Sequence, residues 1–98
     1  MLETLTDASF SPHVGTSCRL LTAPGVSPIE LEIAAVEVVG QGREGRRAPF
    51  SVLFRGPAAR PLPQGTYHVE HERLGALDIF IVPIGPDGAG LGYEAIFN

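Results

Sequence analysis

Glycine and proline interrupt this sequence so often that it has no room for a long helix. Its 98 residues include 12 glycines and 9 prolines, and the longest stretches free of both are residues 1–11 and 29–39. Proline breaks a helix interior and glycine destabilises it, so an uninterrupted helix is limited to about three turns. The other stretches have the usual length of a β-strand. The sequence therefore favours short strands joined by turns, within one small domain spanning residues 1–98.

Alternation of apolar and polar side chains indicates where the strands lie. Phe50, Val52 and Phe54 share one side of a short segment, as expected for a half-buried strand. We predict six strands, over residues 16–22, 29–39, 50–55, 66–72, 77–84 and 91–97. Strands of this length and spacing are typical of a mainly all-β fold, here a small antiparallel six-stranded barrel or sandwich.

Local signals add detail to this fold. The apolar positions change phase at Ala34 and Ala35, which predicts a β-bulge. Residues 85–88 are expected to form a hairpin turn. Residues 56–65, with three prolines, are expected to run extended across one end of the barrel.

The beginning of the chain is the best candidate for a helix. Thr6 or Asp7 is expected to cap a short helix that runs to Phe10. Pro12 is expected to stop it, because proline disfavours helical backbone in the residue before it. Helix should therefore be a minor component, confined mainly to the first fifteen residues.

Charge and cysteine content exclude several classes of protein. The net charge is −4, from 7 arginines, no lysine and 11 acidic residues, which argues against nucleic acid as a partner. A single cysteine cannot form an intramolecular disulfide.

The start of the chain has no apolar core typical of a signal peptide, and no stretch approaches the roughly 20 apolar residues that span a membrane. We therefore expect a cytoplasmic protein with no membrane contact.

One glycine-rich segment resembles a dinucleotide-binding motif. Residues 40–45 match the pattern G-x-G-x-x-G, but a dinucleotide site needs a helix to follow. Pro49 and a predicted strand follow instead, so no cofactor is predicted. The arginines of this loop remain candidates for contact with an anion or an acidic partner surface, as an alternative to a solvated loop; they are Arg43, Arg46 and Arg47.

Three polar side chains alternate along another predicted strand. His68, Glu70 and Glu72 point to one side of residues 66–72 and are residue types that bind divalent metals. Along a strand they span about 13 Å, too far for all three to meet one ion. We predict no metal site here, but an exposed polar surface that pairs with arginines.

His71 and Cys18 both fall on apolar sides of their strands. His71 is expected to be a buried neutral histidine with a backbone hydrogen-bond partner. Cys18 is expected to be a buried thiol that acts as a small hydrophobic group. A Cys–His nucleophile is the catalytic alternative, but no known catalytic motif is present and no catalytic residue is predicted.

Large apolar side chains also fall on the outward side of the predicted strands. Alternation in residues 77–84 places Phe80 and Val82 away from the core. The same rule places Leu53 and Ile96 outward. Four such groups on one outward surface are typical of an interface or of a covered surface. The simplest cover is internal: the N-terminal segment folds over them with its large apolar side chains, Leu2, Leu5 and Phe10. The other expectation is that a second chain is needed as well.

The order of short motifs along the chain resembles a known family. The motifs are Phe10-Ser11-Pro12-His13-Val14-Gly15, Leu62-Pro63-Gln64-Gly65-Thr66-Tyr67, Phe80-Ile81-Val82-Pro83-Ile84-Gly85-Pro86 and Tyr93-Glu94-Ala95-Ile96-Phe97-Asn98. The chain is similar, end to end, to bacterial proteins of about this length that are known only as a domain of unknown function. The resemblance supplies no activity and no catalytic residues. Members are often encoded near phage-tail-collar-like proteins, which implies a role beside a tail-like or fibre-like assembly.

Three functions remain open at this point. The leading prediction is a non-enzymatic module that binds a protein partner or assists assembly, with a homo-oligomer as one possibility; its candidate contacts are Leu53, Phe80, Val82, Ile96, Arg43, Arg46 and Arg47. The second is a barrel that binds a small ligand at one open end, lined by Tyr67, His71, Phe54 and Tyr93. The third is a hydrolase-like enzyme that uses His71 and Cys18.

Overall fold

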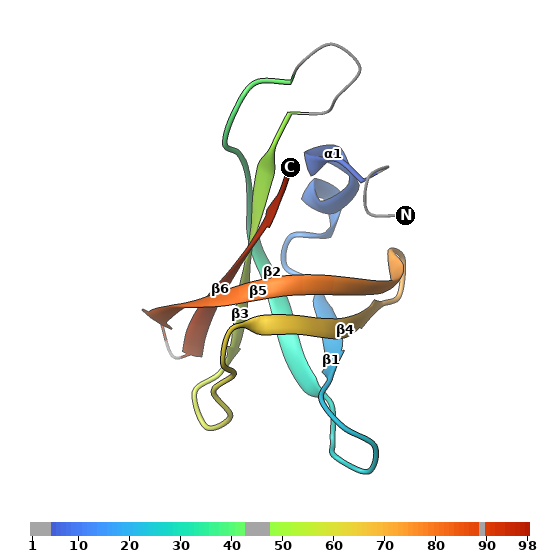
Figure 1. The fold of residues 1–98 in the computed structure, drawn as a ribbon, viewed down its shortest axis with the longest axis vertical. Coiled ribbons are helices and arrows are strands. Elements are labelled where there is room, and N and C mark those ends of the chain that lie inside the picture. Colours follow the sequence, from blue (N-terminus) through green and yellow to red (C-terminus); the bar gives the residue numbers. More distant parts are fainter. Residues whose placement is uncertain (1–4, 43–47, 89) are drawn as a thin grey trace.

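Six antiparallel strands form a closed barrel, one of the two predicted architectures (Figure 1). The computed structural model describes residues 5–42, 48–88 and 90–98. The elements in chain order are α1 (Asp7–Phe10), the short 3-10 helix η2 (Ser11–His13), β1 (Ser17–Leu21), β2 (Ile29–Val38), β3 (Phe50–Pro57), β4 (Gly65–His71), β5 (Gly75–Asp87) and β6 (Gly90–Phe97). None of the helices in these ranges is long and apolar enough to cross a membrane.

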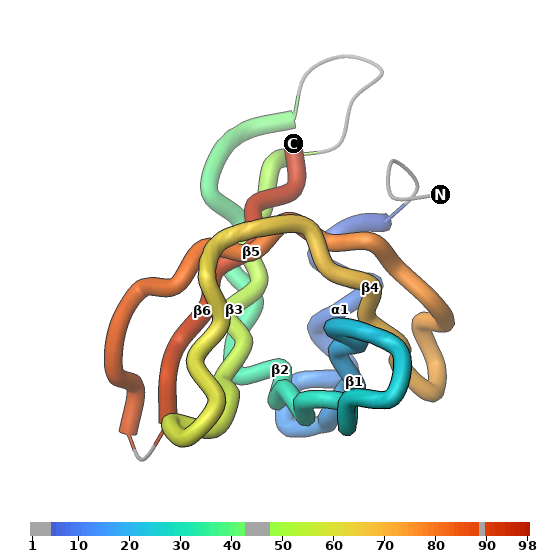
Figure 2. Tube along the Cα trace, turned by 60° about the horizontal axis from the view of Figure 1, so that its bottom comes forward, coloured from blue at the N-terminus to red at the C-terminus, as the bar shows by residue number. Residues whose placement is uncertain are grey.

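The strands follow one another around the barrel in the order β1-β2-β3-β6-β5-β4. β3 and β6 run side by side on one wall, and β1 and β4 run side by side on the opposite wall (Figures 1 and 2). β2, β3 and β6 extend beyond the other strands and form an arm that ends at the C-terminus (Figure 1). This arm and β5 carry the surface described below.

Apart from Phe10, the core is built from inward side chains that alternation along the strands predicted. Those least exposed to solvent are Tyr93, Phe10, Phe50, Phe54, Leu20, Leu31, Ile33, Ile81 and Val52. Burying side chains of this size contributes about 1.5–3 kcal/mol each to the free energy of unfolding. These side chains come from five strands and from α1, so packing in the interior holds these elements together.

The predicted β-bulge is confirmed in β2. The β2–β3 register shifts between Ile33 and Ala35, so one residue of β2 has no partner in β3. After the bulge, Val36 lies opposite Val52, and both face the core side. The bulge therefore lets apolar side chains on both sides of it, from Ile29 to Val36, face the core.

The predicted turn at residues 85–88 is wrong in extent. β5 continues to Asp87, and residues 85–87 pair with β6 after a register shift between Pro83 and Gly85. β4 accompanies β5 only as far as Ile81, so one edge of β5 is open beyond that point. Proline lacks an N–H donor and is tolerated in strands with an open edge, which explains why Pro83 and Pro86 do not end the strand.

The N-terminal helix closes one end of the barrel. α1 begins after Thr6 and ends at Phe10, as predicted. The chain then continues in the 3-10 helix η2, which contains Pro12, because proline is tolerated in a first helical turn. Phe10 is only 1% exposed, and its ring centroid lies 5.9 Å from that of Phe50 and 5.3 Å from that of Phe97. These three rings seal the barrel end between the arm and the β4–β5 hairpin.

The internal cover considered for the outward apolar side chains is therefore wrong for Phe10. Its ring lies on the core side of β3 and β6, where it fills space that the strands leave open at the barrel end. Leu5 is partly buried against the same core. Leu2 lies outside the described residues. The outward side of β3, β6 and β5 is thus left uncovered by α1.

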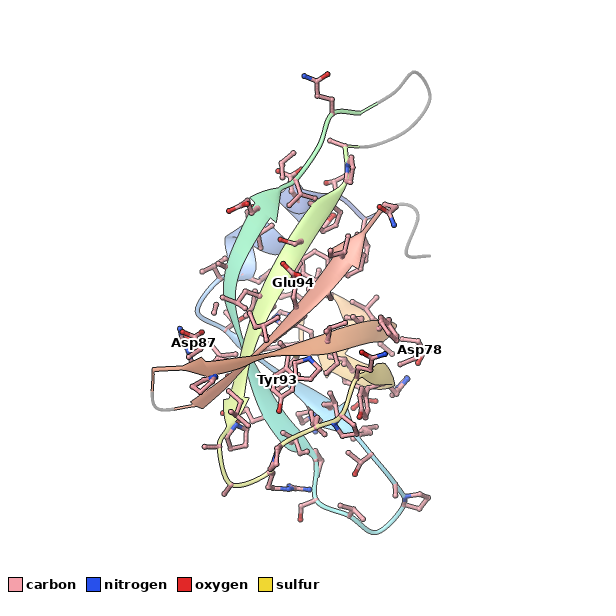
Figure 3. The ribbon with its side chains drawn as sticks, turned by 60° about the vertical axis from the view of Figure 1, so that its left-hand side comes forward. Asp78, Asp87, Tyr93 and Glu94 are labelled. Atoms are coloured by element: carbon pink, nitrogen blue, oxygen red, sulfur yellow. The ribbon has the colours of Figure 1, made fainter. Side chains whose placement is uncertain are left out.

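A loop closes the opposite end of the barrel. Leu62, in the connection between β3 and β4, is buried, and its backbone N–H donates a hydrogen bond of 2.9 Å to the hydroxyl of Tyr93. Figure 3 shows the Tyr93 side chain directed toward this connection. The Tyr67 hydroxyl donates to the carbonyl oxygen of Pro63 at 2.7 Å. The proline-rich segment therefore crosses this end, as expected.

Candidate partner-binding face

The outward sides of β3, β6 and β5 place apolar side chains in neighbouring positions. Glu94 of β6 lies between Leu53 of β3 and Val82 of β5 in the strand pairing. Phe80 and Ile84 lie on either side of Val82 along β5, and Ile96 is the next outward residue of β6. We call this surface the apolar face; it consists of Leu53, Phe80, Val82, Ile84 and Ile96.

The apolar face is open to solvent. Phe80 is 53% exposed, Ile84 55% and Ile96 57%, whereas Leu53 and Val82 are half-buried. The other large apolar side chains that are exposed in the described ranges lie in loops or at the end of β2; they are Val14, Val26, Val38 and Val39. The apolar face is therefore distinguished by its five side chains on one side of three adjacent strands.

The four apolar residues predicted from the sequence all point outward, but they do not form one tight cluster. Leu53 and Val82 flank Glu94. Beyond the Val82–Glu94 pair, β5 and β6 diverge (Figure 1), so Phe80 and Ile96 extend the apolar face in two directions. The three arginines predicted to help, Arg43, Arg46 and Arg47, lie outside the described residues.

Ile84 was not predicted. Ile84 lies between Pro83 and Gly85, at the end of the predicted strand and next to the predicted turn. Nothing in the sequence indicated that the strand continues and places Ile84 on the same side as Val82. A Cβ atom placed on Gly92 would lie 3.1 Å from Cγ1 of Ile84. The absence of a side chain at Gly92 thus lets Ile84 lie across β6 on the apolar face.

A charged group bounds this surface beyond Ile84. The Arg55 guanidinium on β3 binds carboxylate oxygens of Glu32 and Asp87, each at 3.1 Å. The Arg55–Asp87 pair spans the position of Gly92, which lies opposite both Arg55 and Gly85. A charged border around an apolar centre is the usual composition of a protein–protein interface.

The four residues proposed to line a ligand pocket are not brought to one open end. Phe54 and Tyr93 are each 1% exposed and lie side by side in the filled core. Tyr67 contacts the loop at one end of β4, and His71 ends the same strand. Among the described residues, no buried side-chain nitrogen or oxygen lacks a hydrogen-bond partner. The interior therefore presents no unsatisfied polar group to a ligand.

An open depression of about 510 Å³ lies on the outside of the barrel between β1 and β4. Arg19 and Glu70 on its wall pair with each other, with an N–O distance of 2.8 Å. His68, on the same side of β4, lies 3.1 Å from an oxygen of Asp78. These pairs confirm the predicted polar surface and its arginine partner.

His71 is held as a neutral side chain by hydrogen bonds to both ring nitrogens. Its Nδ1 accepts from the backbone N–H groups of Arg73 at 3.0 Å and Leu74 at 3.2 Å. This arrangement puts the ring proton on Nε2, which donates to Oγ1 of Thr16 at 2.8 Å. The Thr16 hydroxyl then donates to the carbonyl oxygen of His13. The prediction of a buried histidine with a backbone partner is confirmed.

Acid is expected to destabilise this arrangement. Burial lowers the pKa of His71 from its ordinary value of 6.5, and the nearby His13 lowers it further. Because the folded pKa is the lower one, the stabilisation is fully present above pH 6.5 and is lost as the pH falls below it. We expect the melting temperature to fall from about pH 7.5 to about pH 5.5. His71→Asn keeps an acceptor near the Nδ1 position and should flatten this dependence; an unchanged slope would contradict the assignment.

Cys18 is a buried thiol. It is 2% exposed, and its Sγ donates to the carbonyl oxygen of Leu31 at 3.4 Å. Burial raises its pKa from 9.0 to about 12. A nucleophilic cysteine needs a lowered pKa and a nearby base. Here the thiol stays protonated, and the hydrogen bonds of His71 are made to other groups.

Comparison with known proteins gives one match. Residues 5–97 match the family described as a domain of unknown function (DUF6916). The curated proteins gave no match, and neither did the solved structures. The match covers almost the whole chain, including every strand of the barrel and the apolar face. The chain therefore belongs to the family described as a domain of unknown function (DUF6916).

Proposed function

We propose that this protein is a non-enzymatic module that binds another protein through the apolar face. One observation carries the proposal: Phe80, Ile84 and Ile96 are each more than half exposed on one side of a barrel whose core is already filled. Exposed apolar surface is unfavourable by about 25 cal/mol per Å². Groups of apolar side chains on the surface of a small domain commonly mark contacts with other proteins.

The competing functions have less support from the geometry. A small-ligand site needs a concave pocket with a few convergent polar groups. Phe54 and Tyr93 instead fill the interior, and the Tyr93 hydroxyl is bonded to Leu62. A hydrolase would need a thiolate at Cys18, whose pKa is raised. Neither alternative explains why apolar side chains gather on the outside.

The nature of the partner is part of the proposal. The resemblance of the sequence motifs implies a bacterial protein that works beside a tail-like or fibre-like assembly. We therefore place the partner among the components of such an assembly, and the cytoplasm is the compartment in which we expect the two to meet. A stable contact would bury about 1,200 Å² or more in total.

Charge substitution on the apolar face should abolish binding without unfolding the protein. In pull-downs from the native host, we expect Phe80→Glu to lose proteins that the wild type retains. With the purified partner, we expect the affinity of Phe80→Glu to be at least about tenfold lower than that of the wild type. The melting temperature should change little, because Phe80 is exposed. Leu53→Asp should act in the same direction.

A matched control tests whether loss of binding is specific to the apolar face or follows from replacing any exposed apolar side chain by a charged one. Val26 is 46% exposed in the loop between β1 and β2, away from the apolar face, so Val26→Glu should retain the wild-type partners. Light scattering on each variant reports whether the partner is a second copy of the chain. If Phe80→Glu and Val26→Glu capture the same proteins with equal affinity, the proposed face is wrong.

A further inference from the structure

Glu94 differs from the other half-buried carboxylates on the strands of the barrel. Glu32 and Asp87 bind Arg55, and Glu70 binds Arg19. Glu94 is also half-buried, but it forms no hydrogen bond or ion pair within the described part of the chain. Figure 3 shows Glu94 on the wall of β3 and β6, well away from Asp78 and Asp87 toward the ends of β5.

The two cross-strand neighbours of Glu94 are apolar. It lies directly opposite Leu53 on one side and Val82 on the other. Ile96 is the next outward residue along β6. A carboxylate in this position keeps its hydration only while the apolar face is open to water. Any partner that covers Leu53 and Val82 must also remove water from Glu94.

From this placement we infer that the partner of the apolar face supplies a basic side chain, best an arginine, to Glu94. The inference rests on the proposed function. A purely apolar partner would bury an unpaired charge, which is strongly unfavourable. An arginine avoids this penalty, because its guanidinium binds a carboxylate through two N–H groups and its planar surface stacks on aromatic rings such as Phe80. Glu94 therefore favours apolar partners that carry a basic side chain and disfavours apolar partners that do not.

The same reasoning disfavours a second copy of the chain as the occupant. A two-fold interface brings the same surface of two copies together. Among the described residues of this surface, each Glu94 would then face apolar side chains or the other Glu94. Arg55 is two positions from Leu53 on β3, but its guanidinium is already held by Glu32 and Asp87. The described part of the apolar face thus contains no free cation for its own carboxylate.

The test uses a displayed library of protein fragments from the native host as the probe. Fragments are selected on the wild-type protein and then screened on Phe80→Glu, Glu94→Gln and Glu37→Gln. Glu37 is an exposed carboxylate on the outward side of β2, so Glu37→Gln is the matched control. We expect fragments that require Phe80 to carry an arginine or lysine among apolar residues. Their affinity should fall about tenfold or more on Glu94→Gln and stay unchanged on Glu37→Gln.

A double-mutant cycle completes the test. Replacing the basic residue of a selected fragment by glutamine should weaken binding to the wild type but not to Glu94→Gln. If fragments require Phe80 but bind Glu94→Gln as well as they bind the wild type, the inference fails and the proposed function stands. Fragments that bind independently of Phe80, or no fragments at all, overturn both. Selection of this chain itself, or a dimer that dissociates in Phe80→Glu, overturns the choice of a different protein as partner.

Discussion

Phe10→Ala is expected to lower the free energy of unfolding by about 3–5 kcal/mol. Phe10 is 1% exposed and contacts the rings of Phe50 and Phe97 at the end of the barrel. Removing its ring leaves a cavity against two other aromatic rings, and the strands around it are held in place by the closed sheet. Since a domain of this size is typically stable by about 5–15 kcal/mol, the loss should be obvious in urea or thermal unfolding.

Phe80→Ala is the matched control for this experiment. It removes the same side chain, but from a position that is 53% exposed on the apolar face. We expect a change of no more than about 0.5–1 kcal/mol. The pair therefore distinguishes an aromatic residue of the core from one that is available to a partner. If Phe80→Ala were as destabilising as Phe10→Ala in a monomeric protein, the apolar face would belong to the core and the proposed function would fail.

Tyr93→Phe is expected to lower the free energy of unfolding by about 1–3 kcal/mol. The substitution keeps the buried ring and removes only the hydroxyl, which accepts a hydrogen bond from the backbone N–H of Leu62. That N–H would remain buried without a partner, because Leu62 itself is buried. The loop that closes this end of the barrel should then be held less firmly. Faster hydrogen exchange at the Leu62 amide is the specific readout.

Tyr67→Phe provides the comparison. Its hydroxyl binds the next residue of the same loop, the carbonyl oxygen of Pro63, but this contact is exposed to water. Water can replace the lost donor, so we expect a change below about 0.5 kcal/mol. Equal effects for the two substitutions would contradict the view that Tyr93 locks the loop. They would also reopen the question of a pocket at this end of the barrel.

Much of the local structure follows from the sequence because the signals are local. Glycine and proline limit the length of each segment, and alternation in β3 and β5 reports which side chains face inward. The phase change at Ala34 predicted the bulge in β2, since only an extra residue keeps Val36 directed toward the core. The outward position of Phe80 followed from the same alternation. The extent of β5 did not, because prolines look like turn signals unless the open edge of the strand is known.

The apolar face was only partly predictable, because it depends on which strands are neighbours as well as on local alternation. Alternation gives the side of a strand on which Leu53 and Val82 lie, but not that the two flank Glu94. That depends on β6 pairing between β3 and β5, an arrangement between segments distant in sequence. Ile84 joins the apolar face only because a register shift and the small size of Gly92 permit it. The sequence likewise does not show that Glu94 lacks an ion-pair partner, because this depends on which side chains lie next to it in the folded barrel.

The six strands, the short helix and most of the inward side chains can be predicted from local signals, because backbone preference and side-chain alternation act within a few residues. The closure of the barrel, the order of its strands and the role of the N-terminal segment depend on contacts between segments that are distant in the sequence. Phe10 could have covered either side of the sheet by hydrophobicity alone. It fills the barrel end because Phe50 and Phe97 meet there when β3 and β6 pair, and this leaves the apolar face open.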